Sequence, residues 1–409
     1  MRSQDKADQQ GFTLVEIMVA TAVTSVIVLA GMAALTMTGK AVRANEQISG
    51  SQQNARLAME MITHDIKMAG FGPLDPTVTP LPVGNCGIGG LPVPILPGDN
   101  SPVAAVPDTG PDQISLVVPL TFYSSGVVGS PPSWQTTAAL GNGGLPFQNV
   151  PITPAISADM IAAGLGPNTF ISLGGIVMAQ VQAAANPIVL AGPIPGSTRI
   201  PLGTQVFILQ CITYQVIPQL AGGTPGADID NICGGNAPCL VRGIANATVV
   251  VGGRILPNCN VPNSPCLPIA TGIEDIQFAY ACDGCLLPGP GLKEPNGLID
   301  DVNLNLIFDQ PDYVSNQLWN TTPMTPSAIK MVQVSIVARQ QSIDNGLGEG
   351  NSQAGPGVLS STFLTVDDHP HAGGVFVAGD AAAQIPPYAS VRRRVVTKTV
   401  ETRNARPWS

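Results

Sequence analysis

An uncharged apolar run from Ile17 to Gly39 constrains the fold of this chain more than any other feature. Its 23 residues contain no proline, and at about 1.5 Å per residue they form a helix of roughly 34 Å, which is long enough to cross the hydrocarbon core of a membrane. A secretory signal peptide would have a shorter apolar stretch with its cleavage site behind it, whereas here a short polar leader, Met1 to Gly11, precedes the run. We therefore expect a transmembrane helix that stays in the mature protein.

One acid, Glu16, stands at the entrance to this run, at the end of the sequence Gly11-Phe12-Thr13-Leu14-Val15-Glu16. A carboxylate at membrane depth costs about 2.5 kcal/mol or more and is usually kept only with a partner. The position of Glu16 therefore predicts a partner for its carboxylate. The alternative is a glutamate at the headgroup boundary of an ordinary membrane anchor.

The sequence from Gly11 to Glu16, joined to a spanning helix, resembles the N-terminal signal of type IV prepilins. The resemblance implies that a prepilin peptidase cuts between Gly11 and Phe12, that Phe12 becomes N-methylated, and that Glu16 pairs with the N-terminal amine of the next subunit. The implied partners are other minor and major pilins, the peptidase and an inner-membrane assembly platform. The implied location is a single pass through the inner membrane before assembly, and afterwards a pilus on the cell surface, with the head periplasmic or extracellular.

The helix is expected to continue beyond the membrane, from about Phe12 to Ala69, over roughly 87 Å. Between residues 55 and 69 the apolar side chains recur at three- and four-residue steps, which is typical of a helix that covers a core. Gly70 and the pair Gly72-Pro73 then end the pattern. The expected domains are the leader, the helix with its membrane span, and the head: 1–11, 12–70 with 17–39, and 71–409.

The head is expected to be one large loop-rich body, because 45 glycines and 39 prolines argue against the two or three domains that the length suggests. Two-residue alternation of apolar side chains predicts half-buried strands at 114–120, 205–209, 276–282 and 332–338. Three stretches without a clear period are interpreted as long ordered loops or insertions: 72–110, 124–200 and 217–270. The expected fold class is α+β, with a long N-terminal helix packed on a largely antiparallel β-sheet head, as in pilins.

Short segments spread over the chain resemble the PilW-like minor pilins in particular. They follow that family's order, from the end of the helix to its closing strand: 56–71, 111–116, 206–211, 272–280, 332–339 and 393–404. The family commonly has a cysteine directly after the helix, where this chain has Gly72-Pro73. The nearest cysteine is Cys86. A disulfide between Cys86 and Cys211 is therefore plausible but is not established by the resemblance.

All eight cysteines follow residue 85, on the side of the membrane that is expected to be oxidising, so we interpret them as disulfide-bonded. Three pairs would close short turn-rich loops: Cys233 with Cys239, Cys259 with Cys266, and Cys282 with Cys285. Eight cysteines allow about a hundred pairings, so this pairing is a hypothesis. A zinc site would need a second pair spaced like Cys282 and Cys285, and a c-type haem would need a histidine where Leu286 stands.

The segment from Asp283 to Asp312 holds six acids and one base, which points to a cation site. Counted from Asp301, positions 1, 3, 5, 9 and 12 of an EF-hand-type calcium loop are occupied by Asp301, Asn303, Asn305, Asp309 and Asp312. However, Leu306 replaces the turn glycine, Asp312 replaces the bidentate glutamate, and the intervening residues alternate as in a strand. The alternation favours a strand whose asparagines face water. A looser calcium site, suggested by the acidic loop that PilW-like proteins often carry here, would use four residues: Glu294, Asn296, Asp300 and Asp301.

The remaining patterns contain no catalytic arrangement. There is no Gly-x-Ser-x-Gly elbow, no phosphate loop and only three histidines, so we expect no enzyme and no required cofactor. The net charge of −9 does not suggest nucleic acid. The sequence from Asp367 to His371 lacks a third metal ligand and is interpreted as a polar turn. The basic tail is interpreted as a strand with its charges outward, with contact to anionic lipid or a partner as the alternative. Its basic residues are Arg392 to Arg394, Lys398, Arg403 and Arg406.

We expect a minor pilin of a type IV pilus that assembles through its helix and supports pilus biogenesis and pilus-dependent adhesion or motility. A head of about 340 residues is bulky to repeat along a thin fibre, so a place at the tip or in the initiating complex is expected. One alternative is a pseudopilin of type II secretion, which shares the N-terminal signal and the closing strand. Another alternative is an adhesin or binding module on a pilin anchor. The apolar stretch 124–200 is the feature that supports this alternative.

Overall fold

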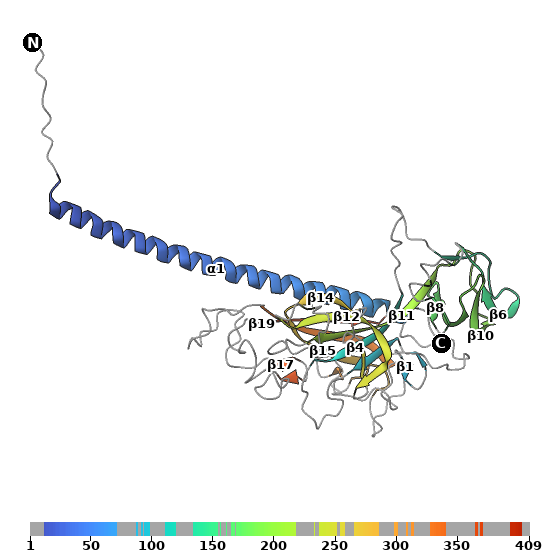
Figure 1. Cartoon of the computed structure of the whole chain (residues 1–409). Coiled ribbons are helices and arrows are strands. Elements are labelled where there is room, and N and C mark those ends of the chain that lie inside the picture. Colours follow the sequence, from blue (N-terminus) through green and yellow to red (C-terminus); the bar gives the residue numbers. More distant parts are fainter. Residues whose placement is uncertain are drawn as a thin grey trace, which may run out of the picture. The chain divides into compact units, whose positions relative to one another are not determined.

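The computed structural model describes the chain from Phe12 through the long helix and, in the head, a set of strands and the residues next to them (Figure 1). The described residues are 12–71, 87–88, 91–92, 94–98, 111–119, 134–153, 156, 161, 165–167, 169–217, 233, 237–251, 254–257, 266–285, 298–301, 308–309, 312–314, 328–340, 365–366, 369–370 and 393–402. The chain divides into two compact units, residues 1–50 and 51–409, and the division falls inside the long helix.

The helix α1 (Leu14–Met68) has 55 residues, and it confirms the long N-terminal helix expected from the sequence. Gly70 lies just after the helix end, and its φ of 68° is the left-handed conformation that glycine adopts without a steric penalty. Within α1, a window of 18 residues has a mean hydropathy of 2.2, and none of it is buried. By length and composition this helix can cross a membrane.

In the second unit, the last turns of α1 bury one face against sheet strands. Ala55, Ala58, Ile62 and Ile66 are fully buried, at the three- and four-residue spacing that predicted a core-facing stripe. They share this first core with strand residues such as Tyr214. The helix therefore contributes one side of the core.

Two antiparallel sheets supply the other side of the first core. The larger sheet centres on β11, which pairs with β4 and β12. Its strands in this region are β3 (Ile95–Gly98), β4 (Gln113–Pro119), β11 (Val206–Ile217), β12 (Cys239–Val251), β13 (Arg254–Pro257) and β14 (Leu267–Thr271).

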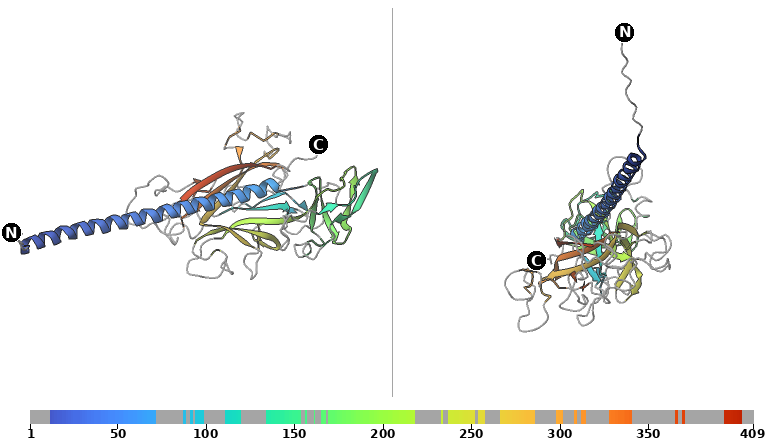
Figure 2. Two further views of the ribbon diagram at one scale, coloured as in Figure 1. Left: turned by 90° about the horizontal axis from the view of Figure 1, so that it is seen from above. Right: turned by 90° about the vertical axis from the view of Figure 1, so that its left-hand side faces the viewer.

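The smaller sheet places β16 between β15 and β19, and these orange-to-red strands lie side by side in Figure 2. Its strands are β15 (Ile273–Cys282), β16 (Ile329–Arg339) and β19 (Arg393–Glu401). Two short pairs complete this part, β1 (Gly87–Ile88) with β2 (Leu91–Pro92), and β17 (Thr365–Val366) with β18 (His369–Pro370).

Asp112 joins the two sheets. Its backbone N–H donates to the carbonyl of Ile276 at 2.9 Å, and its Oδ2 accepts from the backbone N–H of Phe278 at 3.0 Å. Because the side chain takes the place of a strand carbonyl, the start of β4 continues the hydrogen bonding of β15.

Residues 134–208 form a second lobe, which we call the inserted lobe because it lies in the sequence between β4 and the half of β11 that pairs with β4. Apolar side chains of this lobe make a second core, which includes Trp134, Ile171, Val181 and Leu190. Its strands are β5 (Gln135–Thr136), β6 (Gly144–Val150), β7 (Ile152–Thr153), β8 (Phe170–Leu173), β9 (Val177–Ala183) and β10 (Ile188–Gly196).

The strands of the inserted lobe are hydrogen-bonded in a closed circuit that begins and ends at β11. The ladder leads from β11 through β8, β9 and β10 to β6, which continues into β7, and β7 pairs with β5. Gln135 of β5 then forms a bridge with Gln205 beside β11, and the N–H of Val206 donates to the carbonyl of Trp134 at 2.8 Å. This closure removes most open strand edges, so the lobe is a small barrel around its own core.

Of the two interpretations of 124–200, loops or an insertion, the loop interpretation is wrong from residue 134 onward, because the described part there forms the strands of the inserted lobe. Its strands are short and interrupted by glycine and proline, so few of them show the two-residue alternation on which the prediction depended. The same holds for β3 within 72–110 and for β12, β13 and β14 within 217–270. The four strands predicted from alternation are confirmed on β4, β11, β15 and β16. Their predicted half-burial is wrong for β4 and β15, which are buried on both faces, because each lies inside the head with neighbours on both sides.

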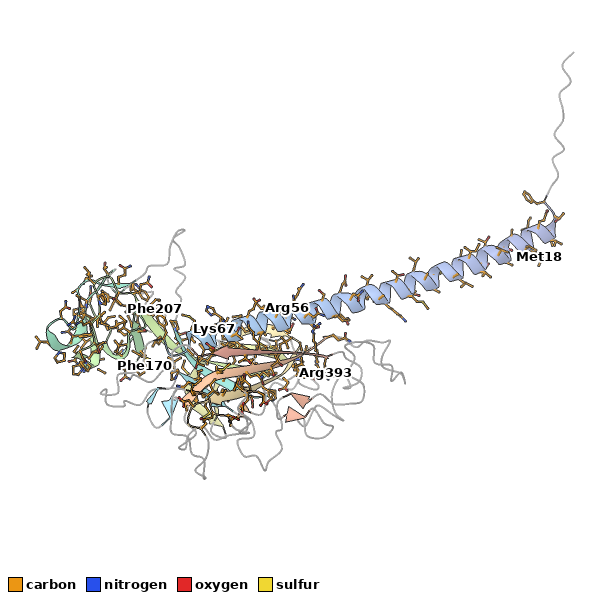
Figure 3. The ribbon with its side chains drawn as sticks, turned by 180° about the vertical axis from the view of Figure 1, so that it is seen from behind. Met18, Arg56, Lys67, Phe170, Phe207 and Arg393 are labelled. Atoms are coloured by element: carbon orange, nitrogen blue, oxygen red, sulfur yellow. A yellow bond between two sulfur atoms is a disulfide. The ribbon has the colours of Figure 1, made fainter. Side chains whose placement is uncertain are left out.

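Phe71 lies where the end of the helix meets the inserted lobe. Its ring packs edge-on against Phe207 with 5.1 Å between ring centroids, and Gly175 in the turn from β8 to β9 leaves room for it. Figure 3 labels Phe207 and Phe170 beside the lobe strands. A small cluster of Val117, Met178 and Leu209 packs between β4, β9 and β11. The lobe is therefore joined to the main sheet by packing as well as by the chain.

Candidate assembly and processing site

Thr13 and Glu16 bind each other at the start of α1. The N–H and the hydroxyl of Thr13 donate to Oε2 of Glu16 at 2.9 and 3.0 Å, and the N–H of Glu16 donates to Oγ1 of Thr13 at 3.3 Å. This reciprocal arrangement is a capping box, which satisfies N–H groups that the first helical turn leaves without partners. The spacing Thr-x-x-Glu in the sequence would have predicted it.

The capping box leaves part of the Glu16 carboxylate available. Oε1 accepts no hydrogen bond from any residue that the structure describes. Oε2 is held at the positive end of the helix dipole, where a carboxylate is stabilised. The chain itself therefore positions the acid at the helix end and keeps one oxygen open to a neighbour.

Phe12 is the first described residue, and its side chain is 85% exposed. Gly11 and the leader lie outside the described residues. The predicted cleavage between Gly11 and Phe12 therefore adjoins an accessible helix end and stays a prediction.

The first unit exposes apolar side chains on every face of α1. The large ones from Leu14 to Val42 are between 49% and 75% exposed, and Met18 projects from the helix in Figure 3. A helix that is apolar all round is not stable in water by itself and is covered by lipid or by other helices.

The hydroxyl groups in this part of α1 are satisfied within the helix. Thr24 and Ser25 donate to carbonyls four residues earlier, each at 2.7 Å, and Thr21, Thr36 and Thr38 make similar bonds at 2.8–3.0 Å. Because no hydroxyl needs water, these residues are compatible with a hydrocarbon environment.

Six cysteines lie in the described part of the chain, and all of them are disulfide-bonded: Cys211, Cys233, Cys239, Cys266, Cys282 and Cys285. Cys233 joins Cys239, and Cys282 joins Cys285, each with 5.8 Å between the Cα atoms. Cys86 and Cys259 lie outside the described residues, so the bridges from Cys86 to Cys211 and from Cys259 to Cys266 stay predictions.

The acidic segment lies beside the end of β15. Asp300 donates its N–H to the carbonyl of Cys282 at 2.8 Å, and its Oδ2 accepts from the N–H groups of Gly284 and Cys285 at 2.9 and 2.8 Å. Its Oδ1 is buried and has no hydrogen-bond partner in the described part of the chain.

The structure describes two of the four residues of the predicted calcium site, Asp300 and Asp301. Asp301 is half-buried, whereas Glu294 and Asn296 lie outside the described residues. Among the residues that the structure does describe, no three His, Cys, Asp or Glu side chains are placed to hold a metal. In the EF-hand alternative, Asn303 and Asn305 are also outside the described residues, and Asp312 accepts a hydrogen bond from the N–H of Asp309 at 2.8 Å.

The interpretation of the basic tail as a strand with its charges outward is wrong at Arg393. That side chain is buried, and its Nη2 donates to Oε1 of Glu274 at 2.9 Å, while Nη1 of Arg339 lies 3.5 Å from the same oxygen. Arg394 and Lys398 are exposed, as predicted. Among the histidines, His64 is exposed beside Asp65. In the segment interpreted as a polar turn, only His369 and Pro370 are described, and they form the short strand β18.

Comparison with known proteins agrees with the geometry of this helix end. The family described as "Prokaryotic N-terminal methylation motif" matches residues 6–32. No curated protein and no solved structure matches the chain. The motif supports a type IV pilin-like protein, of the class that comprises pilins and pseudopilins.

The motif also defines the general behaviour of this class. Its members have structural roles, are processed by a prepilin peptidase and associate with other pilins. Together with the apolar helix α1, the match fits a membrane-anchored, single-pass protein.

Proposed function

We propose that this chain is a minor pilin of a type IV pilus, similar to the PilW-like proteins, and that it supports pilus biogenesis and pilus-dependent adhesion or motility. In this proposal the leader is removed between Gly11 and Phe12, Phe12 is N-methylated, and α1 enters the helical core of the filament.

The observation that carries the proposal is the position of Glu16. Its carboxylate is anchored by Thr13 at the end of a helix that is exposed and apolar on all sides. The cationic N-terminal amine of an adjoining subunit is a partner of the right charge for it, and in an apolar surrounding such a pair is much stronger than in water.

A place at the tip or in the initiating complex is supported by the size of the head. The head carries two hydrophobic cores, one covered by α1 and one inside the inserted lobe. A subunit that repeats along a thin fibre must fit beside copies of itself, and the additional lobe makes this packing harder. At the tip, only one side of the head has neighbours.

The experiment that tests the proposal is Glu16→Ala in the native host. We expect normal insertion into the membrane, because removing a carboxylate lowers the cost of insertion, and loss of the protein from sheared filaments. Glu46→Ala is the matched control, since it removes an exposed acid elsewhere on α1 and should enter filaments normally. Normal amounts of the Glu16→Ala protein in filaments would refute the proposed role of Glu16.

The second candidate function is that of a type II secretion pseudopilin, because the methylation motif is common to both classes. A deletion strain separates the two. Loss of surface pili with normal export of enzymes supports the minor pilin, and the reverse result supports the pseudopilin.

We also propose calcium binding by the acidic segment, with Glu294, Asn296, Asp300 and Asp301 as ligands. The support is Oδ1 of Asp300, which is buried and has no hydrogen-bond partner among the residues that the structure describes. Such a carboxylate oxygen is costly, and a cation would satisfy it. The melting temperature of the full chain in detergent should rise with calcium concentration. Asp301→Asn should reduce that rise, and equal melting temperatures in calcium and in chelator would exclude the site.

A further inference from the structure

The inserted lobe is almost free of charge. Residues 134–208 contain one acid, Asp159, and one base, Arg199, in a protein whose net charge is −9. Among the exposed residues that the structure describes in this lobe, Arg199 is the only charged one. Charged residues usually make up about a quarter of a soluble domain, so this lobe departs strongly from the usual composition.

Apolar side chains occupy part of this uncharged surface. Leu145 on β6 is 72% exposed, Leu202 in the turn before β11 is 66% exposed, and Ile161 is 57% exposed. Pro146 and Pro201, next to the two leucines, are exposed as well. Removing these apolar groups from water lowers the free energy. Few charges nearby would have to be desolvated at the same time, so little of this gain would be lost.

The composition argues against most specific partners. Nucleic acid and anionic lipid require clusters of Lys and Arg, and this lobe has a single base. The residues that dominate binding at specific protein interfaces are enriched in Trp, Tyr and Arg, and Arg199 is the only such residue exposed in the described part of the lobe. The exposed residues described in this lobe can therefore make mainly uncharged and apolar contacts. Such contacts suit a partner that is itself neutral and apolar.

We propose that the inserted lobe is an adhesive surface for uncharged, apolar material. The proposal rests on the adhesion function proposed above and names the class of surface to which the protein attaches. Leu145 and Leu202 are the residues that make contact, and the low charge of the lobe keeps the cost of dehydration small.

The test measures adsorption of the full chain, held in phosphatidylcholine nanodiscs, on methyl-, hydroxyl- and carboxylate-terminated monolayers. The wild-type protein should bind the methyl surface best, and a change from 0.15 to about 1 M salt should not weaken this binding, because screening acts on charges only. Leu145→Lys with Leu202→Lys should reduce the mass bound to the methyl surface by about tenfold or more, since two leucines lose their apolar contact.

Leu267→Lys is the matched control, because Leu267 is 58% exposed on β14, outside the inserted lobe. It should bind like the wild type.

If the double lysine variant melts at a lower temperature than the wild type, Leu145→Asn with Leu202→Asn repeats the test without new charge. Equal adsorption of wild-type and double-variant protein, an equal loss in Leu267→Lys, or a preference for the hydroxyl surface would overturn the proposal. Adsorption in nanodiscs needs no filament, so a failure of the minor-pilin proposal would leave this result unchanged.

Discussion

Asp65 connects the helix to the central strands of the head. Its Oδ2 accepts from the hydroxyl of Tyr214 at 2.6 Å and from Nε of Arg242 at 2.9 Å. Burial, together with the nearby Asp65 carboxylate, raises the pKa of Tyr214 above its ordinary value, so Tyr214 remains a neutral donor. A charged group on α1 is thereby bound to both β11 and β12.

The first prediction concerns Tyr214→Phe, which removes one hydrogen bond to a charged group and should lower the free energy of unfolding by about 1.5–3 kcal/mol. The unfolded state releases the tyrosine proton near pH 10, whereas the folded state keeps it, so this contribution is complete below about pH 10 and decreases above it. Denaturant unfolding at several pH values measures both effects.

His64→Ala is the control for Tyr214→Phe, because His64 is 72% exposed and lies 3.3 Å from the other oxygen of Asp65. An exposed pair of this kind contributes about 0–1 kcal/mol. If Tyr214→Phe had no greater effect than His64→Ala, the hydrogen bond to Asp65 would not stabilise the fold.

At the scale of elements, the turn between β8 and β9 adjoins the end of the helix. Gly175 has a φ of 73°, and a Cβ built on it would lie 3.1 Å from the ring of Phe71. Both the backbone conformation and the space around it therefore favour glycine.

The second prediction is that Gly175→Ala destabilises the protein by about 1–2 kcal/mol through backbone strain and the contact with Phe71. Gly192→Ala is the matched control, since Gly192 has nothing within 4 Å of the added Cβ and no positive φ. It should be neutral or stabilise slightly, because it reduces the entropy of the unfolded chain. Thermal unfolding of the two variants checks the difference, and equal melting temperatures would contradict the packing of Phe71 on this turn.

The disulfides are a second property at this scale, because they close short connections next to strands. Cys239 begins β12, and Cys282 ends β15. The cysteines of both bridges are buried.

The third prediction is that these cysteines react with a thiol reagent only after reduction. Unfolded, non-reduced protein from the native host should give no labelled peptide containing Cys233, Cys239, Cys282 or Cys285, as mass spectrometry can determine. Reduction should lower the free energy of unfolding by about 2 kcal/mol per short bridge. Labelling of these residues without reductant would contradict the pairing in the structure.

At the scale of the whole molecule, the proposed cleavage lies directly before the start of the helix. The methylation motif covers the end of the leader and the first turns of α1. Since Thr13 caps α1, a cut before Phe12 would leave the cap and Glu16 intact.

The fourth prediction is that the mature protein begins with N-methyl-Phe12. Mass spectrometry of material from assembled filaments should find this N-terminal peptide and no peptide that contains Met1. A Gly11→Val variant should retain the leader, because a β-branched residue would replace the glycine at the cleavage position, and it should be absent from filaments. Intact leader in assembled wild-type protein would exclude the processing step.

Features that depend on residues near one another in the sequence could be predicted. The length and polarity of α1 follow from an uninterrupted apolar run and a three- to four-residue period, and four strands of the head followed from two-residue alternation. The capping box of Thr13 and Glu16 is also local, so the sequence determines it by spacing alone.

Only the tertiary structure decided the features that join distant segments. The barrel closes because Gln135 pairs with Gln205, Asp65 meets Tyr214 and Arg242, and Arg393 is buried because Glu274 lies on β15. None of these contacts leaves a periodic pattern in the chain, since each depends on how strands far apart in sequence are ordered in a sheet. The sequence by itself determined an apolar N-terminal helix with Glu16 in its first turn. The order of the strands in space determined that the nearly uncharged segment 134–208 forms a second lobe of the head.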